Sequence, residues 1–316
     1  VKHHAGWRSR FLRSGAPQFA PEPRLRPACV TWEIRRNDTS FFESHLFLTT
    51  FAKQTNERQM KYKAIFSDLD GTLVSFKTHK VPESAKQAIE EARRKGVKFF
   101  ISTGRPYTDL KVAEDLPYDG VVALNGAECR WRDGRLVEEH YLDYEDFKKM
   151  MKFSDEYGFA VCLETNDGFF VNKITPEVIG LATKIDHELP IVCDIDAKFR
   201  EKGCGQLAVY FNEDLQNKLM PELPGLIASR WMPIFADISV RGVTKASGIS
   251  AFAKEMGISI EETISFGDGG NDIPMIEAAG LGIAMGNAGD DVKAAADYIT
   301  SSVDDDGFAA ALRKFV

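Results

Sequence analysis

Short apolar runs alternate with segments of helical periodicity over most of this 316-residue chain. The run "YKAIFS" ends at Ser67, and the segment "ESAKQAIEEARRKG" after Pro82 has the i, i+3, i+4, i+7 apolar spacing of an amphipathic helix. Further apolar runs follow along the chain, and helical segments separate most of them: "VKFFIS", "DGVVALNGA", "TISFG", "LGIAM" and "YIT". Strands that alternate with helices pair in parallel, because each helix carries the chain back across the sheet. The sequence therefore predicts an α/β fold with a doubly wound, Rossmann-like parallel sheet.

The middle of the chain, from about residue 145 to residue 235, breaks this alternation. The strand-like runs "FAVCL" and "FFVNK" lie close together there, and "QLAVYF" and "LIASRW" follow with helical segments in a different order. We expect an inserted α/β domain at 145–235 and a core domain made of 60–144 and 236–316.

Residues 1–59 differ in composition from the rest of the chain. They carry ten lysines and arginines against five acidic residues, whereas the whole chain has a net charge of −7. A Pro-rich stretch, "APQFAPEPRLRP", lies within them, and no period of 2 or 3.6 is sustained. The basic character allows a nucleic-acid-binding or membrane-binding tail. We favour a disordered or non-native extension, with Met60 as a natural start.

Composition excludes several classes of protein beyond Met60. The negative net charge argues against a nucleic-acid-binding protein. No window approaches the roughly 18 apolar residues of a membrane span. The five cysteines are scattered and form no CxxC pair, which argues against zinc and favours a reducing, cytoplasmic location. We expect a monomer or a weak homo-oligomer with a small-molecule substrate.

Polar side chains follow the predicted strands or open a predicted helix at four places. These are Asp68 and Asp70 after the first strand, Ser102, Thr103, Gly104 and Arg105 after the second, Lys245 at the start of "KASGISAFAKEMG", and "GDGGND" (267–272) after "TISF". The carboxyl ends of parallel strands meet at one edge of a sheet, where α/β proteins bind ligands. We therefore expect these side chains to form one site.

Carboxylates gathered at one edge repel each other unless a positive charge lies between them. A divalent cation resolves this conflict, and an all-oxygen ligand set suits Mg²⁺. Thr103, Lys245 and loop amides can then bind a phosphoryl group. One aspartate can attack phosphorus, and the other can transfer protons to and from the leaving oxygen and water. No Walker A motif occurs, so the site is not a P-loop.

Four motifs in this order resemble those of the haloacid dehalogenase (HAD) superfamily: "DLDGT" (68–72), "STGR" (102–105), "GVTK" (242–245) and "GDGGND" (267–272). The insertion between the second and third motifs resembles the α/β cap of the Cof-type phosphatases, subfamily IIB. Longer stretches, such as "RWMPIFADISV" and "DDVKAAADY", are similar to hexose-phosphate phosphatases of that subfamily. The resemblance extends from about Met60 to the C-terminus.

The resemblance implies a role for each motif residue. Asp68 is expected to be the nucleophile and a Mg²⁺ ligand. Asp70 is expected to be the general acid/base and to bind the metal through its backbone carbonyl oxygen. The remaining expected roles are phosphate binding by Thr103, Gly104, Lys245 and Asn271, metal binding by Asp268, and support of the metal or of Lys245 by Asp272.

Taken one at a time, the motifs also fit structural roles. A DxD pair can form a turn or a helix cap, "STGR" can cap a helix, and "GDGGND" can be a plain loop. Arg105 fits two interpretations, one as a group that steers an anionic substrate and one as the partner of a nearby acid. The four motifs in order, each at a strand end or a helix start, favour the joint catalytic interpretation.

The insertion is expected to set substrate specificity by closing over the site. Candidates by residue type alone are Glu164, Asn166 and Asp167 in "ETNDG", and Arg230 and Trp231 further along. The predicted function is a Mg²⁺-dependent phosphomonoester phosphatase that acts on a small metabolite, with a hexose phosphate as the substrate that the resemblance implies. Two alternatives are a phosphosugar mutase and a regulator that accepts a phosphoryl group without turnover.

Deletion of residues 1–59 should leave kcat almost unchanged, because all four motifs lie beyond Met60. Steady-state release of phosphate by the full chain and by the truncated chain tests this expectation. A large loss of kcat would show that the deleted segment belongs to the catalytic fold.

Overall fold

An eight-stranded sheet forms the first layer of the fold, in the strand order β14-β13-β12-β1-β2-β3-β4-β5. The structure is a computed structural model that describes residues 61–185 and 187–316, except for the side chain of Trp231. The extension predicted at 1–59 lies outside the described residues. The strands of this core sheet are β1 (Ala64–Ser67), β2 (Lys98–Ser102), β3 (Gly120–Ala123), β4 (Glu128–Trp131), β5 (Leu136–Glu139), β12 (Thr263–Gly267), β13 (Leu281–Ala284) and β14 (Tyr298–Ile299).

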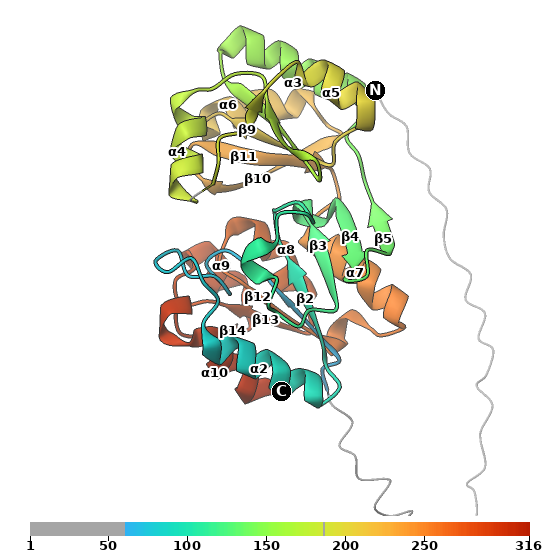
Figure 1. Cartoon of the computed structure of the whole chain (residues 1–316), viewed down its shortest axis with the longest axis vertical. Coiled ribbons are helices and arrows are strands. Elements are labelled where there is room, and N and C mark those ends of the chain that lie inside the picture. Colours follow the sequence, from blue (N-terminus) through green and yellow to red (C-terminus); the bar gives the residue numbers. More distant parts are fainter. Residues whose placement is uncertain (1–60, 186) are drawn as a thin grey trace, which may run out of the picture. The chain divides into compact units, whose positions relative to one another are not determined.

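The six strands from β14 to β3 are parallel to one another, and β4 and β5 add an antiparallel hairpin at the edge. The predicted parallel sheet is therefore confirmed, and Asp133 and Gly134 lie in the turn between β4 and β5. Helices cover both faces of the sheet (Figure 1). They are α2 (Glu83–Arg94), α7 (Lys245–Met256), α8 (Ile273–Ala278), α9 (Asp290–Ala295) and α10 (Gly307–Phe315). Single 3₁₀ turns lie at η1 (Lys111–Ala113), η2 (Leu124–Gly126), η4 (Ile260–Glu262), η5 (Gly270–Asp272) and η6 (Val303–Asp305).

Alternation along the central strands sends successive side chains to opposite faces. Ile65 packs into the cluster shared with α2 and α10. Phe66 packs on the other face, where its ring stacks on Phe100 with the ring centres 4.7 Å apart. Phe252 of α7 completes this cluster, at 4.6 Å from Phe100. Because both faces are covered, the strands read in the sequence as continuous apolar runs.

A second sheet of six strands is formed by the insertion, in the order β10-β11-β9-β6-β7-β8. Its strands are β6 (Ala160–Thr165), β7 (Gly168–Val171), β8 (Ile191–Val192), β9 (Gln206–Tyr210), β10 (Leu226–Met232) and β11 (Phe235–Val240). Its helices are α3 (Tyr144–Tyr157), α4 (Pro176–Lys184), α5 (Ile195–Lys202) and α6 (Glu213–Leu219), with a 3₁₀ turn, η3 (Met220–Glu222).

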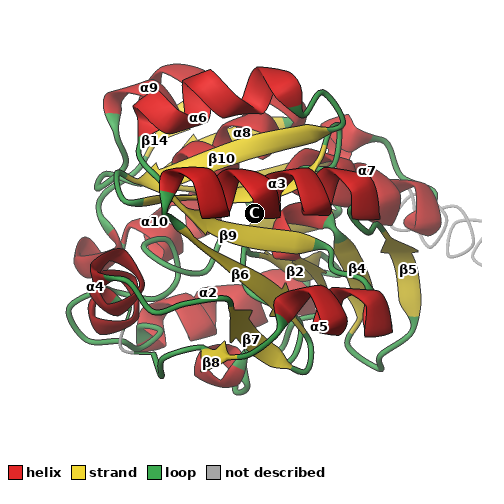
Figure 2. Ribbon diagram, turned by 90° about the horizontal axis from the view of Figure 1, so that it is seen from above, coloured by secondary structure: helices red, strands yellow, loops and turns green. Residues whose placement is uncertain are grey.

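Helices cover one face of this inserted sheet. Side chains of α3, α5 and α6 pack with those of β6, β9 and β11 in a single apolar cluster, and Figure 2 shows α3 and α5 lying over the strands. The opposite face, which we name the inner face, packs against α4 through a smaller cluster that includes Val178, Leu181 and Tyr210. That second cluster leaves part of the inner face for polar side chains.

The C-terminal boundary of the insertion differs from the one predicted at residue 235. Strand β11 runs from Phe235 to Val240 and pairs with β10 and β9, so it belongs to the inserted sheet and not to the core. The chain turns sharply after Met232 and returns along β10. The turn lies at Pro233, a residue type that commonly ends a segment. The sequence alone does not show that the next strand pairs with the inserted sheet, so the insertion was predicted to end there. The insertion therefore spans α3 to β11, residues 144–240.

Within 61–185 and 187–316, no helix combines the length and the apolar character needed to cross a membrane.

Phe100→Ala should lower the free energy of unfolding by about 3–5 kcal/mol, because it removes a fully buried ring that packs against the rings of Phe66, Trp131 and Phe252. Urea denaturation followed by circular dichroism measures the change. Leu136→Ala is the control, since Leu136 is exposed on β5 and its truncation should change the free energy by less than about 0.5 kcal/mol. Equal losses in both variants would contradict this account of the core.

Candidate active site

The four predicted polar segments meet at the carboxyl edge of the core sheet. Strand β1 lies between β2 and β12 and is parallel to both, so Asp68, Thr103 and Asp268 leave the sheet at the same edge. Lys245 is the first residue of α7, whose N-terminus is capped by Thr244. The predicted convergence of these residues thus follows from the pairing of three neighbouring strands.

A buried ion cluster joins three of these segments. The Lys245 ammonium donates to Asp68 Oδ1 and to Asp272 Oδ1, at 2.6 Å in each case. All three side chains are buried. Burial raises the pKa of Asp68 well above its usual range, the charge of Asp272 raises it further, and Lys245 opposes both effects. Burial by itself would lower the pKa of Lys245, but the two carboxylates outweigh it and raise that pKa. The lysine therefore stays charged and stabilises the ionised form of Asp68.

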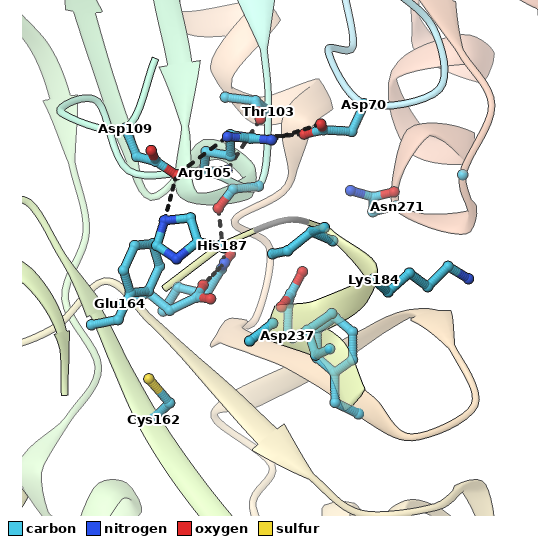
Figure 3. A pocket seen from close by; sticks show the side chains of 18 of the residues that line it. Asp70, Thr103, Arg105, Asp109, Cys162, Glu164, Lys184, His187, Asp237 and Asn271 are labelled. Carbon is cyan, nitrogen blue, oxygen red and sulfur yellow. Dashed lines mark hydrogen bonds and ion pairs between the residues drawn. The ribbon is translucent and has the colours of Figure 1, made fainter. Parts of the chain in front are cut away.

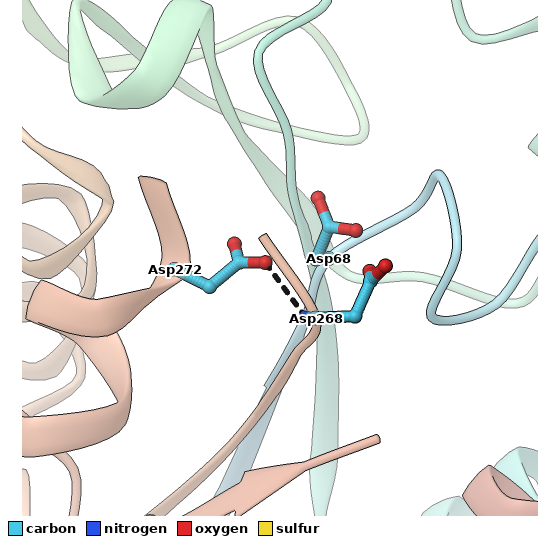
Figure 4. Close-up of side chains that lie close together, drawn as sticks. All are labelled: Asp68, Asp268 and Asp272. Carbon is cyan, nitrogen blue, oxygen red and sulfur yellow. Dashed lines mark hydrogen bonds between the residues drawn. The ribbon is translucent and has the colours of Figure 1, made fainter. Parts of the chain in front are cut away.

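Asp272 also fixes the loop that carries Asp268. Its Oδ2 accepts hydrogen bonds from the backbone N–H groups of Asp268 (Figure 4) and of Gly269, at 2.9 Å each. The Asp268 carboxylate accepts hydrogen bonds from the Thr72 hydroxyl at 2.8 Å and from Asn287 Nδ2 at 3.1 Å. Burial and the charge of Asp272 raise the pKa of Asp268 to about 7. This carboxylate thus lies in a site with excess negative charge.

The donor set fits a hard divalent cation. Carboxylate oxygens of Asp68, Asp268 and Asp272 lie within 4.8 Å of one another. Oxygen ligands of this kind are those that Mg²⁺ binds, and a cation there would offset the charge that raises the pKa of Asp268. The predicted metal ligands were the carboxylates of Asp68 and Asp268 and the backbone carbonyl oxygen of Asp70. The structure brings the carboxylates of Asp68 and Asp268 together with that of Asp272. The side chain of Asp70, which was expected to act as general acid/base, contacts another residue.

That residue is Arg105. Its Nε and Nη2 donate to the two carboxylate oxygens of Asp70, each at 2.8 Å, which is a bidentate pair (Figure 3). Arg105 Nη1 also lies 3.4 Å from Asp109 Oδ2, and His187 of the insertion lies 3.6 Å from the same oxygen. Of the two interpretations offered for Arg105, the structure therefore shows the partner of a nearby acid.

The loop after β2 holds Thr103 and Gly104 against the insertion. The backbone N–H of Thr103 donates to Val122 O at 2.8 Å, which continues the pairing of β2 with β3. The carbonyl oxygen of Gly104 accepts from Gln206 Nε2 of the inserted sheet at 3.1 Å. A Cβ at position 104 would lie 3.3 Å from Asn125 Nδ2, so glycine allows the close approach.

A chain of side-chain amides connects the core edge to the inserted sheet. Asn271 Nδ2 donates to Asn125 Oδ1 at 3.0 Å, and Asn125 Nδ2 donates to Gln206 Oε1 at 2.8 Å and to Asp237 Oδ2 at 3.1 Å. Asn125 follows β3 and has a φ of +52°. Sequence reasoning treated "DGVVALNGA" as a strand only. The Asn-Gly pair at its end was the signal that could have identified a polar strand terminus like the others.

A cavity of about 360 Å³ lies at this junction. Its core side includes Asp68, Asp70, Thr103, Gly104, Asp268 and Asn271, and its other side includes residues of the insertion. Figure 3 shows Glu164 and Asp237 across the cavity from Asp70 and Thr103. Lys245 is fully buried and is not among the lining residues, so in this structure it contacts Asp68 and Asp272 beneath the cavity.

Of the specificity candidates in the insertion, Glu164 lines the cavity. Asn166 instead donates to Glu128 of the core at 2.6 Å, and Asp167 pairs with Lys202 at 2.5 Å. Arg230 donates to backbone carbonyl groups around the β10–β11 turn and to that of Phe211 after β9. The side chain of Trp231 lies outside the described residues. Gln206 and Asp237, which sequence reasoning did not select, line the cavity beside Glu164.

Comparisons with known proteins agree with this geometry. The family model described as haloacid dehalogenase-like hydrolase matches residues 65–312. The 5-amino-6-(5-phospho-D-ribitylamino)uracil phosphatase YcsE of Bacillus subtilis is 32% identical over 264 residues, which cover 80% of this chain and 96% of that protein.

Two solved structures are also similar. The phosphatase BT1666 of Bacteroides thetaiotaomicron has 46% identity and a TM-score of 0.78, over 82% of this chain and 97% of its own. The HAD subclass IIB sugar phosphatase BT4131 has 36% identity and a TM-score of 0.75, over 80% of this chain and 98% of its own.

Gly71→Ala should weaken Mg²⁺ binding about 10-fold to 100-fold, an effect expected when the groups that orient metal ligands are disturbed. Gly71 has a φ of +93°, and a Cβ there would lie 2.2 Å from Asp268 Oδ2, so the carboxylate would have to move. Isothermal titration calorimetry with MgCl₂ measures the affinity.

Gly134→Ala is the matched control, because Gly134 has a φ of +87° but nothing within 4 Å of the added Cβ. Both variants should lose about 1–2 kcal/mol of folding free energy through backbone strain. The control alone should keep its Mg²⁺ affinity. Equal affinities in the two variants would remove Asp268 from the metal site.

Proposed function

The chain belongs to the haloacid dehalogenase-like hydrolases and is a phosphatase of that family, and we propose that it is a Mg²⁺-dependent phosphomonoesterase that works through an aspartyl phosphate. The observation that carries the proposal is the buried contact of Lys245 with Asp68, beside the carboxylates of Asp268 and Asp272. It supplies a carboxylate fixed beside an ammonium at the cavity and a cluster that fits a cation.

In the first half of the proposed reaction, an Asp68 carboxylate oxygen attacks phosphorus. A P–O bond forms to Asp68 as the P–O bond to the leaving alcohol breaks, and Asp70 gives a proton to the departing oxygen. Both oxygens of Asp70 are held by Arg105 in this structure, so proton donation requires that pair to loosen. Arg105 is thus proposed to orient Asp70.

In the second half, water attacks phosphorus from the side opposite Asp68. Asp70 takes the proton of that water, the P–O bond to Asp68 breaks, and inorganic phosphate and the free carboxylate are restored. Once Asp68 is phosphorylated, its own carboxylate charge is lost, and the negative charge beside Lys245 is that of the phosphoryl group. The Lys245 ammonium, 2.6 Å from Asp68 Oδ1, then becomes a phosphoryl ligand.

The phosphoryl oxygens are proposed to bind Thr103, Gly104, Lys245 and Asn271 at the core side of the cavity. Mg²⁺ would be held by Asp68, by Asp268 and by the backbone carbonyl oxygen of Asp70, with Asp272 as the support of Lys245 and of the Asp268 loop. Bound there, the cation would neutralise the charge that develops on the phosphoryl group.

We propose that the substrate is a sugar phosphate, and specifically a hexose phosphate. The insertion would form a cap over the leaving group. The names of two similar proteins support a polyhydroxylated phosphomonoester, since one is a sugar phosphatase and the other acts on a phosphoribityl compound. The cysteines in the described part of the chain are free, which supports a reducing, cytoplasmic location.

Asp68→Asn and Asp70→Asn, assayed with p-nitrophenyl phosphate and Mg²⁺, separate the two halves of the reaction. Asp68→Asn should lower kcat by roughly 10³-fold or more, because an amide is a poor nucleophile. Asp70→Asn should give a burst of about one p-nitrophenolate per enzyme and then slow turnover, because this leaving group needs no proton but the attacking water needs a base. Rapid-quench measurements follow the burst.

Asp133→Asn is the control, since Asp133 lies in the exposed β4–β5 turn and should keep full activity. Activity that survives removal of Mg²⁺ by a chelator would overturn the metal dependence. An Asp68→Asn variant with unaltered kcat would overturn the nucleophile. Label transferred from a sugar bisphosphate to a second sugar, in place of phosphate release, would show a mutase.

A further inference from the structure

The inner face of the inserted sheet carries two acids that the catalytic mechanism does not use, Asp237, which is buried, and Glu164, which is partly buried. Glu164 of β6 lies opposite Gln206 of β9, and Asp237 of β11 lies opposite Ala208 of β9. Residues directly opposite in antiparallel strands share a face, so both acids are on the same face, one on each side of β9. Both line the cavity (Figure 3).

Glu164 is held by an amide and not by a base. Gln206 Nε2 donates to Glu164 Oε2, and among the residues that the structure describes no lysine, arginine or histidine forms an ion pair with Glu164. Burial raises the pKa of Glu164 well above its usual range, and the charge of Asp237 raises it further. The two acids are therefore close enough to influence each other.

The amide donors of this network are directed at the two acids and at the phosphate loop. The side-chain N–H groups of Gln206 donate to Glu164 and to the carbonyl oxygen of Gly104. Those of Asn125 donate to Gln206 and to Asp237. Both acids are thus fixed relative to the loop that carries Thr103. A leaving group bound to them would lie at a set position from the phosphorus.

The other lining residues of the insertion are mostly apolar. Phe169, Val178, Leu181, Tyr210 and Phe235 line the same cavity. The cavity therefore has a carboxylate edge and an aromatic and aliphatic wall. A sugar ring has the same division, with hydroxyl groups around its edge and C–H groups on its faces.

We propose that Glu164 and Asp237 select the leaving group by accepting hydrogen bonds from its hydroxyl groups, while the apolar wall packs against its C–H face. This inference rests on the proposed phosphatase function and adds the residues that recognise the substrate.

The test pairs variants with substrates. Glu164→Gln and Asp237→Asn are assayed for kcat/KM with glucose 6-phosphate, its monodeoxy analogues, glucosamine 6-phosphate and p-nitrophenyl phosphate. In the wild type, removal of a contacted hydroxyl should lower kcat/KM about 10-fold to 100-fold, as expected when a charged hydrogen bond is lost. In the variant that lacks its partner, the same removal should cost less than about 3-fold, because the interaction is already absent.

Asp167→Asn is the matched control. Asp167 lies in the β6–β7 turn, close in sequence to Glu164, but its carboxylate pairs with Lys202. It should keep the wild-type response to every analogue. Thermal unfolding of each variant identifies any that has lost its fold, and an alanine variant at the same position then replaces it.

Three results would overturn the inference. Glu164→Gln and Asp237→Asn could lower kcat/KM for p-nitrophenyl phosphate as much as for glucose 6-phosphate, which would show a general role. The deoxy analogues could respond identically in all variants. The wild type could have a higher kcat/KM for glucosamine 6-phosphate than for glucose 6-phosphate, and Glu164→Gln could remove that difference. This result would show that Glu164 binds an ammonium group. Absence of phosphate release from every compound by the wild type would instead contradict the proposed function itself.

Discussion

The contact of the Lys245 ammonium with Asp68 and Asp272 is the interaction on which the rest of the site depends. Burial of one such charge alone is strongly unfavourable, and the desolvation of a buried ion pair cancels much of its attraction. The cluster is therefore a poor way to stabilise a fold. Its value lies in linking three segments: the loop after β1, the N-terminus of α7, and, through Asp272, the backbone of the loop that carries Asp268.

The two sheets have different tasks because of where their polar groups lie. The core sheet places charged groups at the carboxyl ends of strands, where helix N-termini and loop amides also meet, so it suits phosphate chemistry. The inserted sheet carries its polar groups within its strands, on one face, where the pairing of the strands fixes the spacing between them. Rigid acceptors on a strand pair can distinguish hydroxyl patterns that flexible loops would not.

The sequence predicted the core well because the relevant signals are local. Each apolar run followed by a polar motif marks a strand end, and parallel pairing then brings Asp68, Thr103 and Asp268 together without further information. The contacts between the sheets could not be predicted in this way. Asn125 and Gln206 are far apart in the chain, and nothing in their local spacing indicates that they meet.

Residue type alone was a poor guide within the insertion. Asn166, Asp167 and Arg230 had the right chemistry for a binding site, but each is engaged elsewhere, while Asp237 was placed outside the insertion by the boundary drawn at 235. Asp70 shows the same limit on the core side. Its motif indicated a catalytic aspartate, but only the structure shows that Arg105 holds both of its oxygens.

The junction between the sheets is polar where these contacts cross it: Gln206 to Gly104, Asn125 to Asp237, and Asn166 to Glu128. Each such bond is exchanged for a bond to water when the sheets separate, so each contributes only about 0.5–1.5 kcal/mol to closure. An apolar junction of the same extent would resist wetting far more strongly. Hydrogen bonds that can be exchanged for water therefore fix the shape of the closed cavity and still allow the two sheets to separate by thermal motion. Product release would then not require a large apolar surface to be wetted.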